Sequence, residues 1–288
     1  MHLLLALPAP AKLNLFLHVT GRRRDGYHEL QTAYVLTELA DWLDFERRTD
    51  GAIVRDGDLI GRVEDDLAVR AAHALRQASG TSLGATISVT KRIPAGSGLG
   101  GGSSDAATTL IALNRLWNLN LPRTKLSAIG LQLGADVPFF LHGHHAFAEG
   151  IGERLTTIEL PATWFAIVWP QVPVSTREIF SDAGLTRNSK VTKIADFSAV
   201  AADAAGNLDL PSSLVNDLEP VARRRYPIID EAIKRLERFG AARMTGSGSA
   251  VFITARSREQ AELAIADMPS GWCTWVVQKL VEHPLAVW

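Results

Sequence analysis

A glycine-rich segment, Pro94 to Ser104, carries the clearest chemical signal in the chain. It reads PAGSGLGGGSS and holds five glycines and three serines in eleven residues. Glycine lets the backbone approach a ligand closely with its amides turned inward, and a helix that begins there adds a partial positive charge. A surface turn or a tight packing contact explains one or two glycines, but not five. The segment therefore predicts a phosphate-binding loop.

Three better-known loops do not fit this segment. A Walker A loop requires Gly-Lys-Ser or Gly-Lys-Thr at its end, and none occurs. Gly96, Gly98 and Gly101 match G-x-G-x-x-G, but the dinucleotide fingerprint also needs an acidic residue about twenty positions on, where Asn118, Asn120 and Leu121 stand. The V-A-I-K, H-R-D and D-F-G motifs of protein kinases do not follow in order. Because the acidic residue of the dinucleotide fingerprint is missing, a nicotinamide oxidoreductase is disfavoured.

Hydrophobic periodicity places the loop between a strand and a helix. Alternation over Thr86 to Ile93 predicts a strand that Pro94 ends, and the spacing of apolar residues over Asp105 to Trp117 predicts a helix. An earlier strand, Lys12 to Thr20, alternates in the same way, and the turn-rich GRRRDGY then leads to a second strand around Tyr34 to Leu39. We expect a hairpin there.

Further helices and strands follow from the same patterns. Asp65 or Asp66 can cap a helix through Leu67 to Leu75 that Gly80 ends. After Pro161 the patterns predict an apolar strand at 164–169, a helix at 229–239 stopped by Gly240, and strands near 251 and 276. We place a domain boundary near residue 160, which gives domains 1–160 and 161–288.

Composition indicates a soluble globular protein, with 47% hydrophobic residues, 21% charged residues and a net charge of -1. We expect no nucleic-acid partner, because a pI near 6.7 gives no basic surplus. The only cysteine, Cys273, excludes an internal disulfide and favours the reducing cytoplasm. Leu3 to Leu7 is too short for a signal peptide, and no apolar stretch is long enough to cross a membrane. Nothing in the sequence indicates an oligomeric state.

The loop with its following residues, PAGSGLGGGSSDAA, resembles the signature of the GHMP superfamily of small-molecule kinases. PAPAKLNLFLHV (Pro8 to Val19) and MTGSGSAVF (Met244 to Phe252) stand where that family carries two further elements. The resemblance implies an ATP-dependent phosphotransferase and an α+β two-domain fold. Its N-terminal domain would be ribosomal-protein-S5-domain-2-like and its C-terminal domain ferredoxin-like.

Three other segments narrow the resemblance within the superfamily. AKLNLFLHVTGRRRDGYHEL, LGADVPFF and HAFAEGIGE resemble the branch that phosphorylates the 2-hydroxyl of a diphosphocytidyl sugar alcohol, in the non-mevalonate route to isoprenoid precursors. The nearest alternative is another kinase of this superfamily, with the same loop and with homoserine, mevalonate or a sugar as its acceptor. A non-catalytic nucleotide-binding protein on the same scaffold is the alternative from another class.

The resemblance also assigns site residues. Asp136 would be the catalytic base and Lys12 its electrostatic partner, whereas an isolated aspartate near Gly and Pro is usually a cap or turn residue and a lysine is usually solvated. Lys12 and Asn14 share a strand face because the period of a strand is two. The expected nucleotide-binding residues are Lys91, Pro94, Ala95, Gly96, Ser97, Gly98, Leu99, Gly100, Gly101, Gly102, Ser103, Ser104 and Asp66. The expected acceptor-binding residues are Asn14, Tyr27, His28, Tyr34, Thr176 and Phe180.

Magnesium is expected with ATP, because phosphoryl transfer requires charge neutralisation. No acidic residue lies between Asp105 and Asp136, so we name no protein ligand and expect phosphates and water, with Ser104, to hold the ion. His142, His144 and His145 favour a polar turn over a metal site. Asp66 departs from the asparagine that related kinases carry near the adenine, and a carboxylate cannot donate a hydrogen bond as an amide can.

Overall fold

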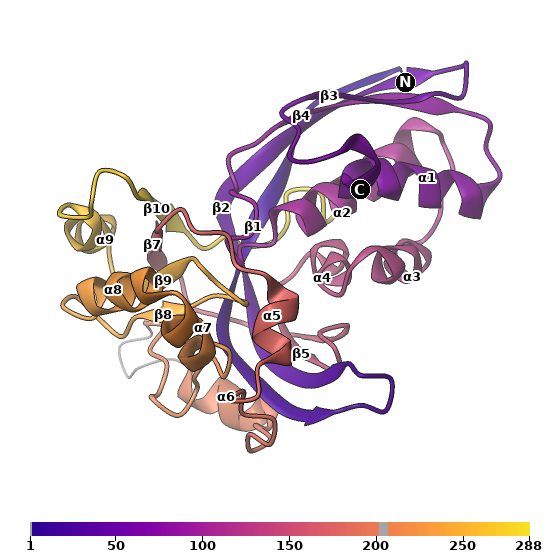
Figure 1. Cartoon of the computed structure of the whole chain (residues 1–288). Helices are drawn as coiled ribbons and strands as arrows, with labels where there is room; N and C mark the ends of the chain where they lie inside the picture. Colours follow the sequence, from indigo (N-terminus) through magenta and orange to yellow (C-terminus); the bar gives the residue numbers. More distant parts are fainter. Residues whose placement is uncertain (1, 202–206) are drawn as a thin grey trace.

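The computed structural model describes residues 2–201 and 207–288, and within them the strands form a six-stranded and a four-stranded sheet. In Figure 1 the hairpin of β1 and β2 runs as one long twisted ribbon through the molecule, with the four-stranded sheet on the left. The strands are β1 (Leu3–Arg22), β2 (His28–Arg48), β3 (Ile53–Gly57), β4 (Gly84–Thr90), β5 (Ala146–Glu149), β6 (Arg154–Thr157), β7 (Trp164–Trp169), β8 (Arg243–Met244), β9 (Val251–Ala255) and β10 (Cys273–Gln278).

The predicted hairpin is confirmed, but it is much longer than the alternating segment that predicted it. β1 pairs antiparallel with β2 along almost its whole length, with register shifts at four places. One half of β2 also pairs with β4 and the other half with β5, so the two long strands link both ends of the sheet. Strict alternation is absent before Lys12 because residues 3–11 are all apolar, and Ala9, Pro10 and Ala11 are all buried.

Helices cover one face of this sheet, and other helices pack on the second sheet. β3, α1 and β4 form a parallel crossover unit, and the glycine-rich segment leads from β4 into α2. The helices are η1 (Val63–Asp65), α1 (Leu67–Ser79), α2 (Gly101–Leu116), α3 (Arg123–Leu133), α4 (Val137–His142), α5 (Thr176–Ser181), α6 (Ile194–Val200), α7 (Glu219–Arg225), α8 (Pro227–Leu236) and α9 (Arg258–Ile265).

The C-terminal sheet has the strand order β10-β7-β9-β8, with every neighbouring pair antiparallel. The chain runs from β7 through helices to the β8–β9 pair, and then through α9 to β10. This β-α-β-β-α-β sequence is the ferredoxin-like arrangement. The strand at 164–169 and the strands near 251 and 276 are confirmed, and the helix predicted at 229–239 spans 227–236.

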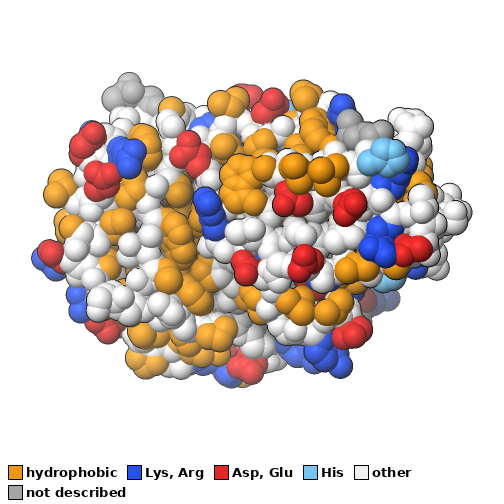
Figure 2. Space-filling view, turned by 90° about the horizontal axis from the view of Figure 1, so that it is seen from above, with side chains coloured by type: hydrophobic (Ala, Val, Ile, Leu, Met, Phe, Trp, Pro, Cys, Tyr) orange, Lys and Arg blue, Asp and Glu red, His pale blue; other side chains and the backbone are white. Residues whose placement is uncertain are grey.

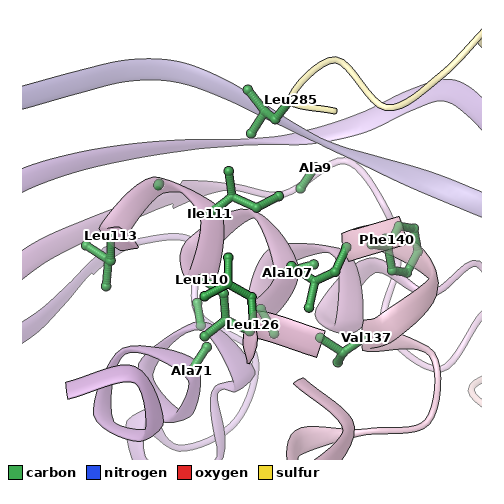
Figure 3. Packing of buried hydrophobic residues seen from close by; sticks show 14 of the residues in the cluster. Ala9, Ala71, Ala107, Leu110, Ile111, Leu113, Leu126, Val137, Phe140 and Leu285 are labelled. Carbon is green, nitrogen blue, oxygen red and sulfur yellow. The ribbon is translucent and has the colours of Figure 1, made fainter. Parts of the chain in front are cut away.

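Three groups of buried apolar side chains hold these layers together. The first lies between α1 to α4 and the sheet, and Figure 3 shows Ala107 and Leu110 of α2 on the side of Leu126 and Val137, with Ile111 on the opposite side toward the sheet. The second lies between the two sheets, and the third packs α7, α8 and α9 on the C-terminal sheet. Leu285, near the C-terminus, returns to the first group and ties the chain end to the N-terminal half.

Local predictions around α1 and α2 had different outcomes. Asp66 is the N-cap of α1, where its carboxylate accepts hydrogen bonds from two backbone amides, and Gly80 ends the helix in the left-handed conformation, as predicted. α2, however, begins at Gly101 and not at Asp105. The last four residues of the glycine-rich segment are therefore the first turn of a helix. Apolar periodicity missed that turn, because glycine and serine carry no apolar side chain.

The surface mixes charges of both signs. On the face in Figure 2, acidic and basic side chains alternate with apolar ones, as the net charge of -1 suggests. Among the helices of the described residues, none is long and apolar enough to span a membrane.

Candidate active site

A cavity of about 1010 Å³ lies where the two halves of the chain meet. Its walls come from β1, the glycine-rich segment, the start of α2, the residue before α4, α5 and the turn after β8. These walls come from five stretches that are far apart in sequence. The cavity therefore exists only in the folded chain, and its floor and walls carry the charged groups described next.

Lys12 and Asp136 face each other at the centre of the cavity. The Lys12 Nζ lies 3.7 Å from Asp136 Oδ2, and it also donates a hydrogen bond to Asn14 Oδ1. The Tyr34 hydroxyl donates to Asp136 Oδ1 at 2.9 Å. The lysine side chain is 4% exposed, whereas the aspartate is 31% exposed and so reaches the cavity. One hydrogen-bond donor and one ion-pair partner thus hold the accessible carboxylate.

Burial shifts the titration of the groups around this carboxylate. Burial lowers the pKa of Lys12, although the charge of Asp136 opposes that shift. Burial and then the charge of Asp136 raise the pKa of the Tyr34 hydroxyl well above its usual value. Tyr34 therefore keeps its proton at neutral pH and acts as a permanent hydrogen-bond donor to the carboxylate.

Asp136 occupies a capping position without capping. It precedes the short helix α4 as its N-cap, with Pro at the start of the helix, yet its side chain accepts no hydrogen bond from the helix amides. An aspartate at such a position ordinarily turns back to the N–H groups of the first turn. Here Tyr34 and Lys12 divert it into the cavity. The carboxylate gives up local helix stabilisation, which is typical of a functional group.

The glycine-rich segment is held between the two halves of the molecule. Gly98 and Gly100 have positive φ angles of 81° and 78°, and a Cβ at Gly98 would collide with the carbonyl oxygen of Thr245 in the turn after β8. A Cβ at Gly100 would stand 3.0 Å from Lys12 Cγ. The glycines thus let this segment lie directly against the lysine, and α2 begins at once with amides that have no partner within the helix.

Lys91 lies at the end of β4 between two carboxylates. Its Nζ bonds to Asp41 and, at 2.6 Å, to Asp105 Oδ2 in the second turn of α2. Burial raises the pKa of Asp105 to about 7, with Lys91 opposing this shift and Asp41 adding to it. Asp41 Oδ1 accepts from the Arg92 and Ile93 amides. This network fixes the angle between the strand and the helix at the entrance to the glycine-rich segment.

Aromatic groups line the other end of the cavity. The His28 and Phe180 rings stack with centroids 5.1 Å apart, and Tyr27 is 60% exposed beside them. Thr176 shares a 2.8 Å hydrogen bond with Ser247, in the turn after β8. This end offers flat faces and directed polar atoms, whereas the glycine-rich end offers backbone amides. The two ends suit ligands of different chemistry, with Asp136 between them.

Known proteins match this chain over both halves. The family model described as GHMP kinases N terminal domain matches residues 66–144, and the model described as GHMP kinases C terminal matches residues 196–272. The 4-diphosphocytidyl-2-C-methyl-D-erythritol kinase of Aromatoleum aromaticum is 51% identical over 282 residues, 98% of this chain and 95% of that protein. The kinase of the same name from Burkholderia pseudomallei is 51% identical over 278 residues, 96% of this chain and 94% of that protein.

The chain belongs to the GHMP kinase family. A crystal structure of 4-(cytidine 5'-diphospho)-2C-methyl-D-erythritol kinase superposes with a TM-score of 0.80 at 35% identity, covering 94% of this chain and 98% of that one. Homoserine kinase from Cytophaga hutchinsonii has the same fold, with a TM-score of 0.67 at 17% identity over 98% of this chain and 96% of that one. The GHMP kinase fold expected from the resemblance is confirmed, and the chain is a phosphotransferase of this family.

Most residues that the GHMP resemblance indicated line this one cavity. Two do not: Leu99 is fully buried in the core between the sheets, and Ser104 is fully buried within α2. Leu99 contributes instead through its carbonyl oxygen, which accepts from the Lys12 amide at 2.9 Å. The residues that line the cavity are Lys12, Asn14, Tyr27, His28, Tyr34, Asp66, Lys91, Pro94, Ala95, Gly96, Ser97, Gly98, Gly100, Gly101, Gly102, Ser103, Asp136, Thr176 and Phe180.

Asp66 and the histidines have mainly structural partners. Asp66 lines the cavity while it caps α1 and pairs with Arg55 at 2.9 Å. No cluster of three or more metal-ligating side chains occurs in the described part of the chain, so His142, His144 and His145 form no such site there. His145 is not a turn residue at the surface: it is 4% exposed and accepts from the Leu36 amide at 3.2 Å.

Sequence reasoning missed two groups near the cavity. Thr245 Oγ1 accepts from the Asn14 amide at 2.9 Å, and Arg187 Nε donates to His28 Nε2 at 3.2 Å. The MTGSGSAVF motif pointed to the region of Thr245 but not to its contact with β1. Arg187 stands in a polar stretch with no periodic pattern, so no signal in the sequence singled it out.

Proposed function

We propose that this chain transfers the terminal phosphoryl group of ATP to the 2-hydroxyl of 4-diphosphocytidyl-2-C-methyl-D-erythritol, a step in the non-mevalonate route to isoprenoid precursors. The main observation behind this proposal is that the carboxylate of Asp136 does not cap its helix and lies instead between Tyr34 and Lys12 in the cavity. The high identity to kinases with that name supports the choice of acceptor.

In this mechanism the glycine-rich end holds the triphosphate. Amides of Gly98 to Ser103 surround the phosphates, and the start of α2 adds its partial positive charge. The acceptor oxygen attacks the γ-phosphorus while the bond from that phosphorus to the β–γ bridging oxygen breaks, so ADP leaves with the electron pair. Asp136 accepts the hydroxyl proton late in the step, and Lys12 offsets negative charge on the transferred group.

The aromatic end holds the nucleotide of the acceptor. Cytosine would stack between Tyr27 and Phe180, while His28 bonds to its polar edge. Asn14 and Thr176 would contact the sugar alcohol and its phosphates, which have to cross the middle of the cavity. In this arrangement the acceptor hydroxyl would lie at Asp136, between the two ends.

We propose that Mg²⁺ enters with ATP. Ser104 Oγ, in the first turn of α2, has no hydrogen-bond partner among the described residues, but Ser104 is fully buried and does not line the cavity, so its hydroxyl is not exposed to the phosphate end. Phosphate oxygens and water would therefore supply the ligands. The ion would neutralise phosphate charge when bound.

Two coarser assignments accompany this function. We propose that the chain divides near residue 160 into a unit that carries Lys12 and Asp136 and a unit built on the second sheet. We also propose that the enzyme works in the cytoplasm, where ATP and nucleotide-linked intermediates are available.

The deciding experiment is ADP release measured against a panel of acceptors: the diphosphocytidyl sugar alcohol, homoserine, mevalonate and a free sugar. Turnover with the diphosphocytidyl compound, abolished in Asp136→Asn, is expected. Preference for another acceptor would leave a GHMP kinase with a different substrate. Binding of ATP without turnover on any acceptor would support a non-catalytic nucleotide-binding protein instead.

A further inference from the structure

Arg187 donates a hydrogen bond to His28 and has no role in the mechanism proposed above. Its Nε donates to His28 Nε2 at 3.2 Å, and its Nη2 donates to the carbonyl oxygens of Phe180 and Asp182 at 3.1 and 2.7 Å. Nη1 donates to the Leu185 carbonyl oxygen at 3.1 Å. Every nitrogen of the guanidinium group is thus engaged. The arginine fixes the end of α5, which carries Phe180, relative to the histidine on β2.

The chemistry of the two side chains determines which nitrogen of His28 carries the proton. A guanidinium group can only donate hydrogen bonds, so the Nε2 that it contacts has to be the bare, accepting nitrogen. A neutral imidazole carries one proton, which must then reside on Nδ1. The doubly protonated ring is disfavoured as well, because burial, and then the charges of Arg187 and Arg22, lower the pKa of His28.

The remaining nitrogen is left for a ligand. His28 lines the cavity, and no residue within 2–201 or 207–288 forms a hydrogen bond with its Nδ1. We propose that Arg187 is a positioning residue that locks His28 as an Nδ1–H donor and thereby selects cytosine over uracil in the acceptor. This inference rests on the proposed function. Cytosine N3 is a bare acceptor that matches the donor, whereas uracil N3 carries a hydrogen that opposes it.

The expected preference for cytosine over uracil follows from one hydrogen-bond donor, the Nδ1–H of His28, that uracil leaves without an acceptor. Leaving a partly buried donor without an acceptor typically costs a factor of roughly 5 to 150 in binding. In Arg187→Met, His28 is free to adopt the Nε2–H form, whose bare Nδ1 accepts from uracil N3. We expect the ratio of kcat/KM for cytidine over uridine acceptors to fall at least roughly fivefold. The change should appear in the acceptor KM, with the kcat and the KM for ATP nearly unchanged.

Two further variants distinguish control of the His28 tautomer from simple structural support of the segment after α5. Arg187→Lys keeps a donor-only cation and should retain more of the cytidine preference than Arg187→Met. Arg123 is a matched control, because its Nη atoms also donate to backbone carbonyl oxygens, those of Leu141, Leu285 and Ala286, far from the aromatic end. Arg123→Met should cost stability without changing the cytidine preference.

The direct test is NMR of the whole protein labelled with ¹⁵N in its histidines, with the His28 signals assigned by their loss in His28→Gln. Two-bond ¹H–¹⁵N correlations report which ring nitrogen is protonated. We expect Nδ1–H in the wild type and loss of that single form in Arg187→Met. An Nε2–H form in the wild type, or an equal loss of preference in Arg123→Met, would overturn the inference. A wild type with Nδ1–H but no turnover of any cytidine acceptor would refute the proposed function instead.

Discussion

Lys12 and Asp136 should act as one unit, and a double-mutant cycle on kcat tests this. The charges lie 3.7 Å apart, which corresponds to a gross attraction of about 4.5 kcal/mol at an effective dielectric constant of about 20. Loss of one preorganised electrostatic group typically lowers kcat by about 100- to 1,000-fold, and loss of a general base by about 100- to 10,000-fold. We expect losses of those sizes for Lys12→Met and Asp136→Asn, respectively.

The double variant should be little slower than the slower single variant, because both groups act in the same transition state, Asp136 on the hydroxyl proton and Lys12 on the transferred phosphoryl group. Rapid-quench measurement of the single turnover with saturating ATP and acceptor isolates the chemical step. If the two losses multiply, the residues act independently and the pair is misassigned. A kcat within tenfold of the wild type in either single variant would likewise refute the mechanism.

The Lys12→Met substitution, which should lower kcat, should not lower the free energy of unfolding. Burial places the folded-state pKa of Lys12 below its unfolded value, so the protonated side chain costs stability below that unfolded pKa, and the cost vanishes above it. Lys12→Met removes this cost at neutral pH, and Tyr34 still donates to Asp136. Urea denaturation should therefore show an equal or higher free energy of unfolding. A large loss would mean that the ion pair supports the fold.

Three further predictions follow from the geometry. Gly98→Ala should lower both the melting temperature and the ATP affinity measured by calorimetry, because the φ of Gly98 is 81° and an added Cβ would meet the Thr245 backbone. The control Gly102→Ala, whose added Cβ has its nearest contact at 3.4 Å, should fold normally. Equal melting temperatures of the two variants would contradict the loop geometry. Tyr27→Ala should raise the acceptor KM by roughly 5- to 150-fold and leave the KM for ATP unchanged, since stacking on one base contributes about 1 to 3 kcal/mol; a parallel rise in both would place Tyr27 elsewhere. His145 has a folded-state pKa of about 4, below the usual 6.5, so the stability that its neutral form contributes is present above pH 6.5 and declines by about 3 kcal/mol as the pH falls to 4. Urea denaturation at pH 7 and pH 5 should show a smaller pH dependence in His145→Asn, and an unchanged dependence would disprove this role.

Sequence patterns predicted the features that depend on neighbours along the chain. The period of two put Lys12 and Asn14 on one face of a strand, and in the structure the Lys12 Nζ donates to Asn14 Oδ1. Glycines between a strand and a helix predicted a loop at the start of α2. Asp66 and Gly80 were recognisable as caps because capping is a local interaction of side chain or backbone with one helix turn.

Contacts between distant segments could not be predicted in that way. Tyr34 and Asp136 are 102 residues apart, and their hydrogen bond depends on how α4 packs against β2. No periodic pattern encodes such packing, so Tyr34 entered the expected site only through the family resemblance. Arg187 and Thr245 had no such assignment at all. Their partners, His28 and Asn14, lie 159 and 231 residues away in the sequence.

The contacts of Thr245 explain why the kinase site needs both halves of the chain. Its hydroxyl accepts from the Asn14 amide at 2.9 Å, and its carbonyl oxygen leaves no room for a Cβ at Gly98. A rotation of the second sheet would therefore move the turn after β8 against the glycine-rich segment and the strand of Lys12 at once. Lys12 is buried under that turn, with its Nζ 3.2 Å from where a Cβ of Gly246 would stand. The turn after β8 thus contacts both the glycine-rich segment and Lys12, so these two parts of the site cannot be repositioned separately.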